Sequence, residues 1–128
     1  MTSTVRLIVA GAAAVVAFDA LASAVSRATG ISYTWASLGS WILYAGTGYL
    51  VARSAPVSAV RMAAIAGAVL GATDASIGWA ISWMIGPGRM PEGLTPARWV
   101  WTLIFMMAMA AGIAALGGRF GRPHSDTV

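Results

Sequence analysis

Four long apolar stretches constrain the fold of this chain more than any other feature. An α-helix needs about 17 to 25 apolar residues to cross the hydrocarbon layer of a bilayer. Short segments that hold most of the charged residues separate the stretches, which cover residues 7–25, 35–52, 62–85 and 100–116. The sequence therefore predicts an all-α integral membrane protein, built as one domain with a four-transmembrane-helix bundle.

The composition agrees with this prediction and excludes several kinds of chemistry. Only 9% of the residues are charged, whereas a soluble domain carries about 25%. The chain has no Cys, no Lys and a single His, His124. These absences exclude disulfides, Cys-ligated metals, a Lys Schiff base and a buried His-ligated haem. No catalytic motif occurs, so we expect a non-enzymatic protein without a cofactor or metal.

Turn and capping residues predict the helix boundaries. Gly30 suits a left-handed cap after the first helix, and Thr34 suits the N-cap of the second. Pro56 suits the first turn of the third helix, and Thr95 followed by Pro96 suits the start of the fourth. The predicted helices cover about residues 5–26, 35–53, 57–85 and 97–117, and residues 118–128 form a polar C-terminal tail.

The arginines predict how the helices are oriented. With the amino terminus inside, five arginines lie on the inner side and three on the outer side: Arg6, Arg53, Arg61, Arg119 and Arg122 against Arg27, Arg89 and Arg98. This bias places both termini in the cytoplasm. We expect a multi-pass protein of a bacterial plasma (inner) membrane. The arginines are scattered singly, so the net charge of +4 does not indicate nucleic-acid binding.

The amino-terminal stretch has a second interpretation as a secretory signal. Arg6, the apolar run that follows it and the small residues Ala22, Ser23 and Ala24 resemble the three regions of such a signal. Asp19 lies between the apolar run and the small residues, which is an unfavourable place for a charge in a signal. We therefore favour a retained membrane helix.

The chain also contains a possible internal repeat. A shift of 55 residues aligns Arg6 with Arg61 and Asp19 with Asp74. Helices 1–2 and 3–4 are then two parallel two-helix repeats. Coincidence in an Ala-rich chain is the alternative. At 1.5 Å per residue each Asp lies roughly 20 Å from its Arg, so both carboxyl groups lie at similar depth.

Asp19 and Asp74 are the candidate functional residues. A charged Asp within the bilayer costs on the order of 2.5 to 3.5 kcal/mol, so such residues usually face the protein interior and are often functional. The sequence predicts a substrate or ion site formed by both acids and nearby polar side chains: Asp19, Asp74, Ser23, Ser40, Tyr44, Thr47 and Thr102. The alternative is structural, with neutral Asp side chains joining the helices by hydrogen bonds.

Small residues on the third helix predict a packing face. Gly67, Gly71, Asp74 and Gly78 follow one another at steps of four, three and four, so they share one side of an α-helix. Small residues let membrane helices approach closely. We therefore expect Gly67, Gly71 and Gly78 to be helix-packing residues and Asp74 to lie within the same contact face.

All the tryptophans lie toward the outer side in the predicted topology. We call them the outer aromatic rim: Trp35, Trp41, Trp79, Trp83, Trp99 and Trp101. An aromatic belt at the lipid headgroups is the ordinary explanation, and a docking surface for another membrane protein is the alternative. Trp79 follows Asp74 by five residues, roughly 140° around an α-helix, so we expect it to face lipid or a partner.

These features favour a small proton- or cation-linked transporter or channel unit that uses the pair of Asp residues. Four short helices scarcely enclose a pathway alone, so we expect a homodimer in the lipid bilayer. The alternative is an accessory or scaffold subunit that packs against a larger membrane protein complex.

Overall fold

The computed structural model describes residues 2–55, 57–87 and 93–122, and its regular elements are helices. Pro56, Arg89 and the end of the predicted tail, 123–128, lie outside the described residues. The elements in chain order are α1 (Ser3–Thr29), the short 3₁₀ helix η1 (Tyr33–Trp35), α2 (Ala36–Ser54), α3 (Ala59–Thr73), the π-helical turn η2 (Asp74–Gly78), α4 (Trp79–Ile85) and α5 (Pro96–Phe120).

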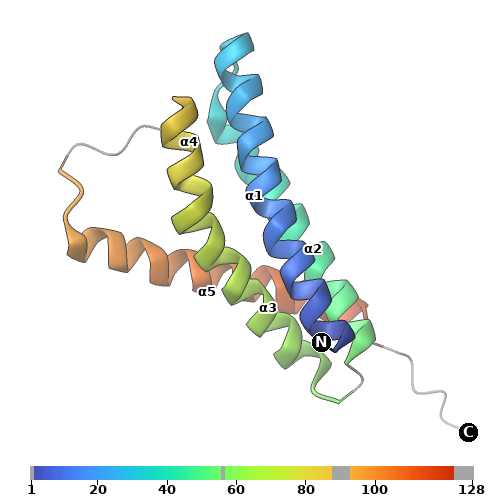
Figure 1. The fold of residues 1–128 in the computed structure, drawn as a ribbon. Helices are drawn as coiled ribbons and strands as arrows, with labels where there is room; N and C mark the ends of the chain where they lie inside the picture. Colours follow the sequence, from blue (N-terminus) through green and yellow to red (C-terminus); the bar gives the residue numbers. More distant parts are fainter. Residues whose placement is uncertain (1, 56, 88–92, 123–128) are drawn as a thin grey trace, which may run out of the picture.

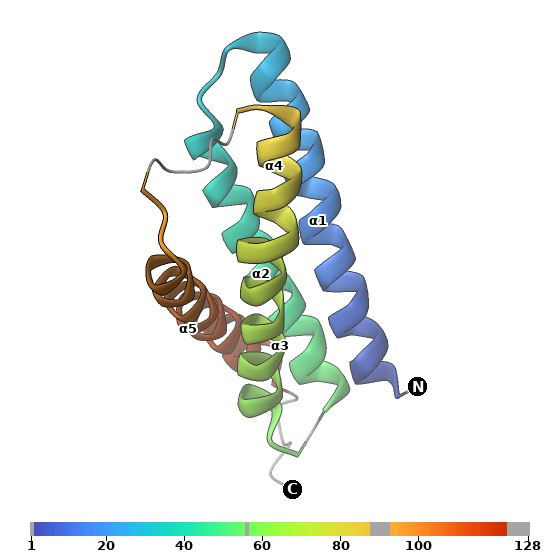
Figure 2. The ribbon, with the colours of Figure 1, turned by 60° about the vertical axis from the view of Figure 1, so that its left-hand side comes forward.

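The helices α1 and α3–η2–α4 run in one direction and pack against each other, and α2 packs against both in the opposite direction (Figure 1). We call the end where α1 begins the near end and the end where α1 and α4 finish the far end. The helix α5 crosses the others obliquely, and its C-terminal part returns to the near end (Figure 2).

Three helices among the described residues are long and apolar enough to cross a membrane. They are Ser3–Thr29, Ala59–Ile85 and Pro96–Phe120. The second of these is one continuous helix made of α3, η2 and α4. The predicted all-α class is thus confirmed, whereas α2, with 19 residues, is a fourth helix outside this group of three.

Some predicted helix ends are confirmed and others are wrong. Gly30 caps α1 with a φ of 72°, and the Thr95 side chain caps α5 next to Pro96. Thr34 is not the N-cap of α2 but lies inside η1, where its backbone N–H donates to the Ser32 side chain. The helix α3 begins at Ala59, and α5 continues to Phe120, into the segment predicted as a polar tail.

The π-helical turn at Asp74 is the main irregularity of the continuous helix Ala59–Ile85. The backbone N–H of Trp79 donates to the carbonyl oxygen of Asp74, five residues earlier. The Ser76 hydroxyl donates to the carbonyl oxygen of Ala72 at 2.5 Å, which gives that carbonyl group a side-chain partner. Single π turns inside α-helices are frequent at functional sites.

The glycines of the predicted packing face contact two different helices, α5 before this turn and α1 at its end. A Cβ atom at Gly67 would overlap the carbonyl oxygen of Ala110 on α5, and one at Gly71 would lie 2.6 Å from the carbonyl oxygen of Met106. Gly78, at the end of the turn, faces Asp19 of α1 instead. The stripe therefore does not form one contact face, because the π turn rotates the part of the helix that follows it.

Small residues also bring α5 against α2. A Cβ atom at Gly48 would overlap the carbonyl oxygen of Ala114. The buried residues of α5 are Ala110, Ala114 and Gly118, at steps of four. Residues that precede Ala110 on α5 are only half-buried or exposed, and this half of the helix extends away from the other helices (Figures 1 and 2).

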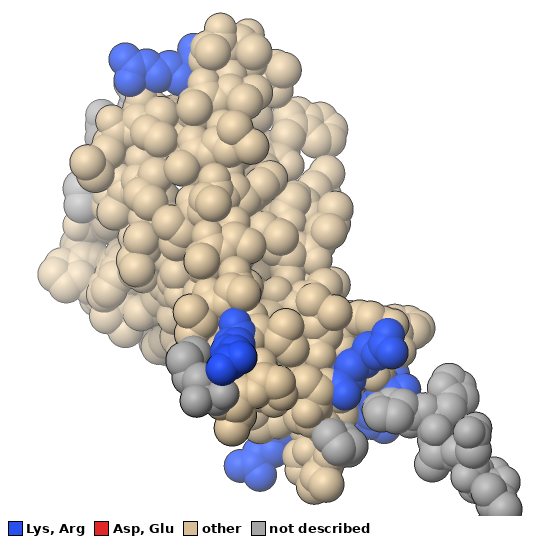
Figure 3. All heavy atoms as spheres, turned by 45° about the vertical axis from the view of Figure 1, so that its right-hand side comes forward, with Lys and Arg blue, Asp and Glu red and all other residues tan. Residues whose placement is uncertain are grey.

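The buried core lies between the carboxyl groups and the near end. One cluster consists of Val15, Tyr44, Leu70 and Ala110, and a second of Ala52, Ala59 and Ala63. Most of the basic side chains visible in Figure 3 lie at the near end, and no acidic side chain is visible on that face. The apolar core thus lies toward the same end of the molecule as most of the basic side chains on the surface seen in that figure.

Candidate functional site

The structure brings the two buried carboxyl groups together at Gly78. Asp19 on α1 is 1% exposed and Asp74 on η2 is 5% exposed. A Cβ atom at Gly78 would lie 3.1 Å from Cγ of Asp19 and 3.2 Å from Oδ1 of Asp74, and it would overlap Oδ2 of Asp19. The missing side chain at Gly78 is therefore what lets α4 and α1 approach at this level.

A tyrosine hydroxyl donates to each carboxyl group. Tyr33 of η1 donates to Oδ1 of Asp19 at 3.1 Å, and Tyr44 of α2 donates to Oδ2 of Asp74. Tyr44 is fully buried. Burial, and secondly the nearby Asp19 carboxyl group, raise the pKa of Tyr33 to about 12. Tyr33 is thus a neutral hydrogen-bond donor at physiological pH.

Three buried oxygen atoms at this level have no hydrogen-bond partner within the described part of the chain. They are Oδ2 of Asp19 and the hydroxyl oxygens of Ser23 and Ser82. A buried polar atom without a partner carries a desolvation cost of about 1 to 3 kcal/mol. Such an atom calls for an explanation, and a shared proton, water or ligand supplies one.

A cavity of about 220 Å³ adjoins the two carboxyl groups. Its polar lining consists of Asp19, Tyr33, Ser37, Ser40, Tyr44 and Asp74. The rest of its lining is mostly aromatic and sulfur-containing: Trp41, Trp79, Phe105, Met106 and Met109, with Ala36. We call this space the carboxyl cavity. It collects side chains from α1, η1, α2, η2, α4 and α5.

Trp79 corrects one prediction about the carboxyl cavity. We expected this residue to face lipid or a partner, because five residues of α-helix place it far around from Asp74. In the structure it lines the cavity together with both Asp residues. In the π turn residue 79 hydrogen-bonds to residue 74, so the two positions stack one above the other, as residues four apart do in an α-helix.

The other predicted site residues divide into two groups. Ser40 lines the carboxyl cavity, and Ser23 is fully buried at the same level. Thr47 lies away from the cavity, where its side chain contacts Gly11 between α1 and α2. The Thr102 hydroxyl donates to the carbonyl oxygen of Arg98 on its own helix, and Thr102 does not line the cavity.

Tyr33 and Ser82 belong to the site but were not predicted to do so. In the sequence, Tyr33 lies just before the predicted second helix, close to Trp35, and therefore resembles a residue at the lipid headgroups. The signal that could have found Ser82 was present, because it continues the steps of four from Asp74 and Gly78 along the third helix. Tyr33 had no such signal, since only the turn through η1 returns its hydroxyl to Asp19.

The tryptophans of the outer aromatic rim differ in their exposure and in the cavities that they line, although the Trp79 and Trp83 rings lie 6.1 Å apart. Trp35 and Trp101 are largely exposed, whereas Trp41 and Trp79 line the carboxyl cavity. Trp83 and Trp99 line a separate cavity of about 350 Å³ with Leu94, Thr95 and Pro96. The tryptophans therefore occupy three different environments.

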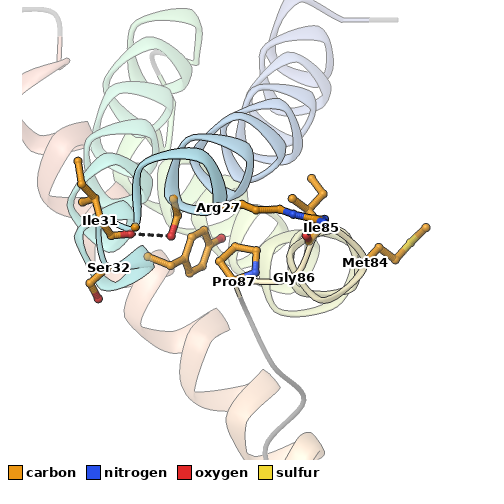
Figure 4. A pocket seen from close by; sticks show the side chains of 10 residues that line it. Arg27, Ile31, Ser32, Met84, Ile85, Gly86 and Pro87 are labelled. Atoms are coloured by element: carbon orange, nitrogen blue, oxygen red, sulfur yellow. Dashed lines mark hydrogen bonds between the residues drawn. The ribbon is translucent and has the colours of Figure 1, made fainter.

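A second, more open cavity of about 620 Å³ lies at the far end (Figure 4). Arg27 reaches across from the end of α1, and its Nη1 donates to the carbonyl oxygen of Ile85 at 2.6 Å. A cation at the C-terminal end of a helix is favourable because it meets the unpaired carbonyl groups. Tyr33 lines both this outer cavity and the carboxyl cavity, so it lies between the two spaces.

Within the described residues, no three His, Cys, Asp or Glu side chains are placed to hold a metal ion. No family model, curated protein or solved structure matches this chain. Two carboxyl groups that are held together and hydrogen-bonded by hydroxyl groups can bind a proton or a monovalent cation.

We expect Tyr44→Phe to lower the free energy of unfolding by about 1 to 2 kcal/mol, because it removes the hydroxyl group that donates to a buried carboxyl group. Titration with sodium dodecyl sulfate in mixed micelles, followed by tryptophan fluorescence, measures this change. Tyr49→Phe is the matched control, since within the described residues the Tyr49 hydroxyl accepts a hydrogen bond only from the exposed Arg53 side chain. Equal changes in the two variants would contradict the assignment of Tyr44 to the site.

Proposed function

We propose that this protein is a small proton-linked transporter or channel unit that binds a cation in exchange for a proton at Asp19 and Asp74. In this proposal α1, α2, the continuous helix Ala59–Ile85 and α5 all cross a bacterial plasma membrane. Both termini are cytoplasmic, so the near end faces the cytoplasm and the far end faces outward.

One observation carries the proposal: two buried carboxyl groups from different helices meet at Gly78, and Oδ2 of Asp19 has no hydrogen-bond donor among the described side chains. A purely structural Asp is expected to have its oxygens satisfied by donors from neighbouring helices. Here the unsatisfied oxygen lies against Gly78, which Oδ1 of the second acid also approaches. Such an arrangement favours binding of a positive charge.

The close pairing of the two acids explains how a cation can replace a proton at the site. Two carboxylates held close together cannot both be ionised at low cost in an apolar environment, so the pair retains one proton. A cation that enters the cavity supplies the compensating charge and lets that proton leave. The hydroxyl groups of Tyr33 and Tyr44 donate to the carboxyl groups, which keeps both acids in place in either state.

The two sides of the site differ in access, as alternating access requires. Toward the far end, Tyr33 is the one residue of the described part of the chain that lines both the carboxyl cavity and the open outer cavity. Toward the near end, the buried cluster of Val15, Tyr44, Leu70 and Ala110 intervenes. This asymmetry supports a state in which the site communicates with the outer side and is closed to the cytoplasm.

A homodimer is part of the proposal. The N-terminal half of α5 extends away from the other helices, with Trp101 and Phe105 exposed at 72% and 64%. A second copy of the chain would cover this half-helix and enclose the side of the carboxyl cavity that Phe105 and Met106 line.

The test is cation-driven proton flux in liposomes that contain the purified protein and a pH-sensitive dye. We expect flux in Asp19→Asn and in Asp74→Asn to fall by roughly tenfold or more, the factor that a loss of about 1.4 kcal/mol produces. Asn preserves the shape of the side chain but cannot exchange a proton.

Thr102→Val is the control for this experiment, because among the described residues the Thr102 hydroxyl group bonds only within its own helix. Its flux should equal that of the wild type. Equal flux in all four proteins, or none above empty liposomes in the wild type, would overturn the proposal.

The exposed half of α5 also favours a second candidate, an accessory subunit of a larger membrane complex. This candidate predicts that purification from native membranes in a mild detergent recovers a different protein in fixed ratio. Recovery of a homo-oligomer alone would argue against it.

A further inference from the structure

We propose that the substrate of the carboxyl cavity is a small organic cation that carries an aromatic or alkyl group, such as a quaternary ammonium compound. This inference rests on the proposed function, because it names the class of cation that replaces the proton at Asp19 and Asp74. It depends on four properties of the cavity: its charge, its walls, its size and its opening.

The charge of the cavity is negative and incompletely compensated. Both Asp residues line it, and both are at least nine-tenths buried. Oδ2 of Asp19 lacks a donor within the described residues. Arg27 does not line this cavity and uses its Nη1 for the carbonyl oxygen of Ile85. A ligand with a positive charge therefore gains more from this cavity than a neutral one.

The walls of the cavity suit an organic cation better than a bare metal ion. Trp41, Trp79, Tyr44 and Phe105 line it together with two methionines. Aromatic faces attract organic cations, and quaternary ammonium ions in particular. A hard cation such as Na⁺ or Ca²⁺ needs a shell of oxygen ligands, which apolar rings cannot replace.

The size of the cavity agrees with this class of ligand. Its volume of about 220 Å³ is equivalent to about seven water molecules at roughly 30 Å³ each. A single dehydrated inorganic ion would leave most of this space empty. A compact ammonium ion with one ring would occupy a much larger share of it.

The cavity also has an opening toward the surroundings of the helices. Trp41 is 43% exposed and Phe105 is 64% exposed, although both line the cavity. Trp41 belongs to α2 and Phe105 to the N-terminal half of α5, so the exposed side of the cavity is the side that these two helices line. A cation with an apolar group partitions into the bilayer interface and reaches the carboxyl groups from the side.

Binding should be coupled to proton release. The titratable groups of the cavity are Asp19 from α1, Tyr33 from η1, Tyr44 from α2 and Asp74 from η2, whereas α4 and α5 contribute apolar side chains. When one cation binds, the proton shared by the two acids leaves to solution, and the net charge of the site does not change. The apparent affinity therefore falls as the pH is lowered, because protons compete with the cation.

The experiment uses benzyltrimethylammonium as the probe and neopentylbenzene as its uncharged counterpart of similar shape. Titration calorimetry of the full chain in detergent, in buffers with different ionisation enthalpies, gives the affinity and the number of protons released. We expect saturable binding of the ammonium ion with release of up to one proton, and no saturable binding of neopentylbenzene. Na⁺ alone should not compete at similar concentrations.

Variants of Trp79, an aromatic residue that lines the carboxyl cavity, test the assignment of the ligand class. Trp79→Leu should weaken binding by about tenfold, and Trp79→Phe should restore part of the affinity, because it keeps an aromatic face. Trp35→Leu, at an exposed position outside the cavity, is the control. Asp19→Asn should abolish the proton release.

The outcomes separate this inference from the proposed function. Asp-dependent proton flux without saturable binding of the probe overturns the organic-cation assignment and leaves the transport proposal standing. Binding of the probe with Asp-dependent proton release, but without flux in liposomes, supports the assignment and overturns transport. Equal binding of the neutral compound, or unchanged affinity in both Trp79 variants, also overturns the assignment.

Discussion

Gly48→Val should lower the free energy of unfolding by about 3 kcal/mol, the upper part of the range for overpacking a close-packed interface. A Cβ atom at Gly48 would overlap the carbonyl oxygen of Ala114 and lie 2.7 Å from its carbonyl carbon and Cα atoms. These are backbone atoms of α5, so no side-chain rotation relieves the overlap. The helices α2 and α5 must separate, and α5 then loses its contact with α2 as a whole.

Gly46→Val is the matched control, because it makes the same change two residues earlier on the same helix. A Cβ atom at Gly46 meets no other atom within 4 Å. Unfolding in sodium dodecyl sulfate, followed by tryptophan fluorescence, should therefore give the wild-type midpoint or a slightly higher one for Gly46→Val. If Gly48→Val unfolded at the same midpoint as Gly46→Val, the close contact between α2 and α5 would be wrong.

Much of the helical architecture follows from the sequence, because its causes are local. Apolar length predicts the long helices, and Gly30 and the pair Thr95 and Pro96 predict helix ends that the structure confirms. The equal intervals from Arg6 to Asp19 and from Arg61 to Asp74 predicted that the two acids lie at the same level. The structure brings them together at Gly78. Depth along a helix depends only on residue number, so sequence predicts it well.

The direction in which side chains point around a helix was harder to predict. A 3.6-residue period places Trp79 away from Asp74, but the π turn brings it onto the same side. The same turn sends Gly67 and Gly71 toward α5, and Gly78 toward α1. A π turn has no clear composition signal, because tertiary contacts and the back-bonded Ser76 hydroxyl select it.

Residues outside the helices were also missed for a physical reason. Tyr33 belongs to the site because η1 folds back over the end of α1, and the periodicity of neither helix contains that information. Thr102 was predicted to lie at the site. It does not reach the site, because α5 crosses the other helices obliquely and only its part from Ala110 onward is buried (Figure 2).

Gly78→Ala should reduce proton flux in liposomes to the level of empty liposomes while leaving the protein folded. The added methyl group would occupy the position of Oδ2 of Asp19, and it would lie 3.2 Å from Oδ1 of Asp74. The Asp19 carboxyl group is the end of a flexible side chain, so it can move away at moderate cost. Ala also favours helix over Gly by about 1 kcal/mol, which offsets part of that cost. The substitution therefore separates the two acids but retains both.

This combination distinguishes a transport site from a structural contact. If the two Asp residues only join the helices, Gly78→Ala should lower stability and activity together, since both would depend on the same contact. If the acids work as a pair that shares a proton, flux is lost because each acid now titrates alone. Gly46→Ala is the control, with wild-type flux expected at a position that has open space around it. Wild-type flux in Gly78→Ala would show that transport does not require the two carboxyl groups to be in contact.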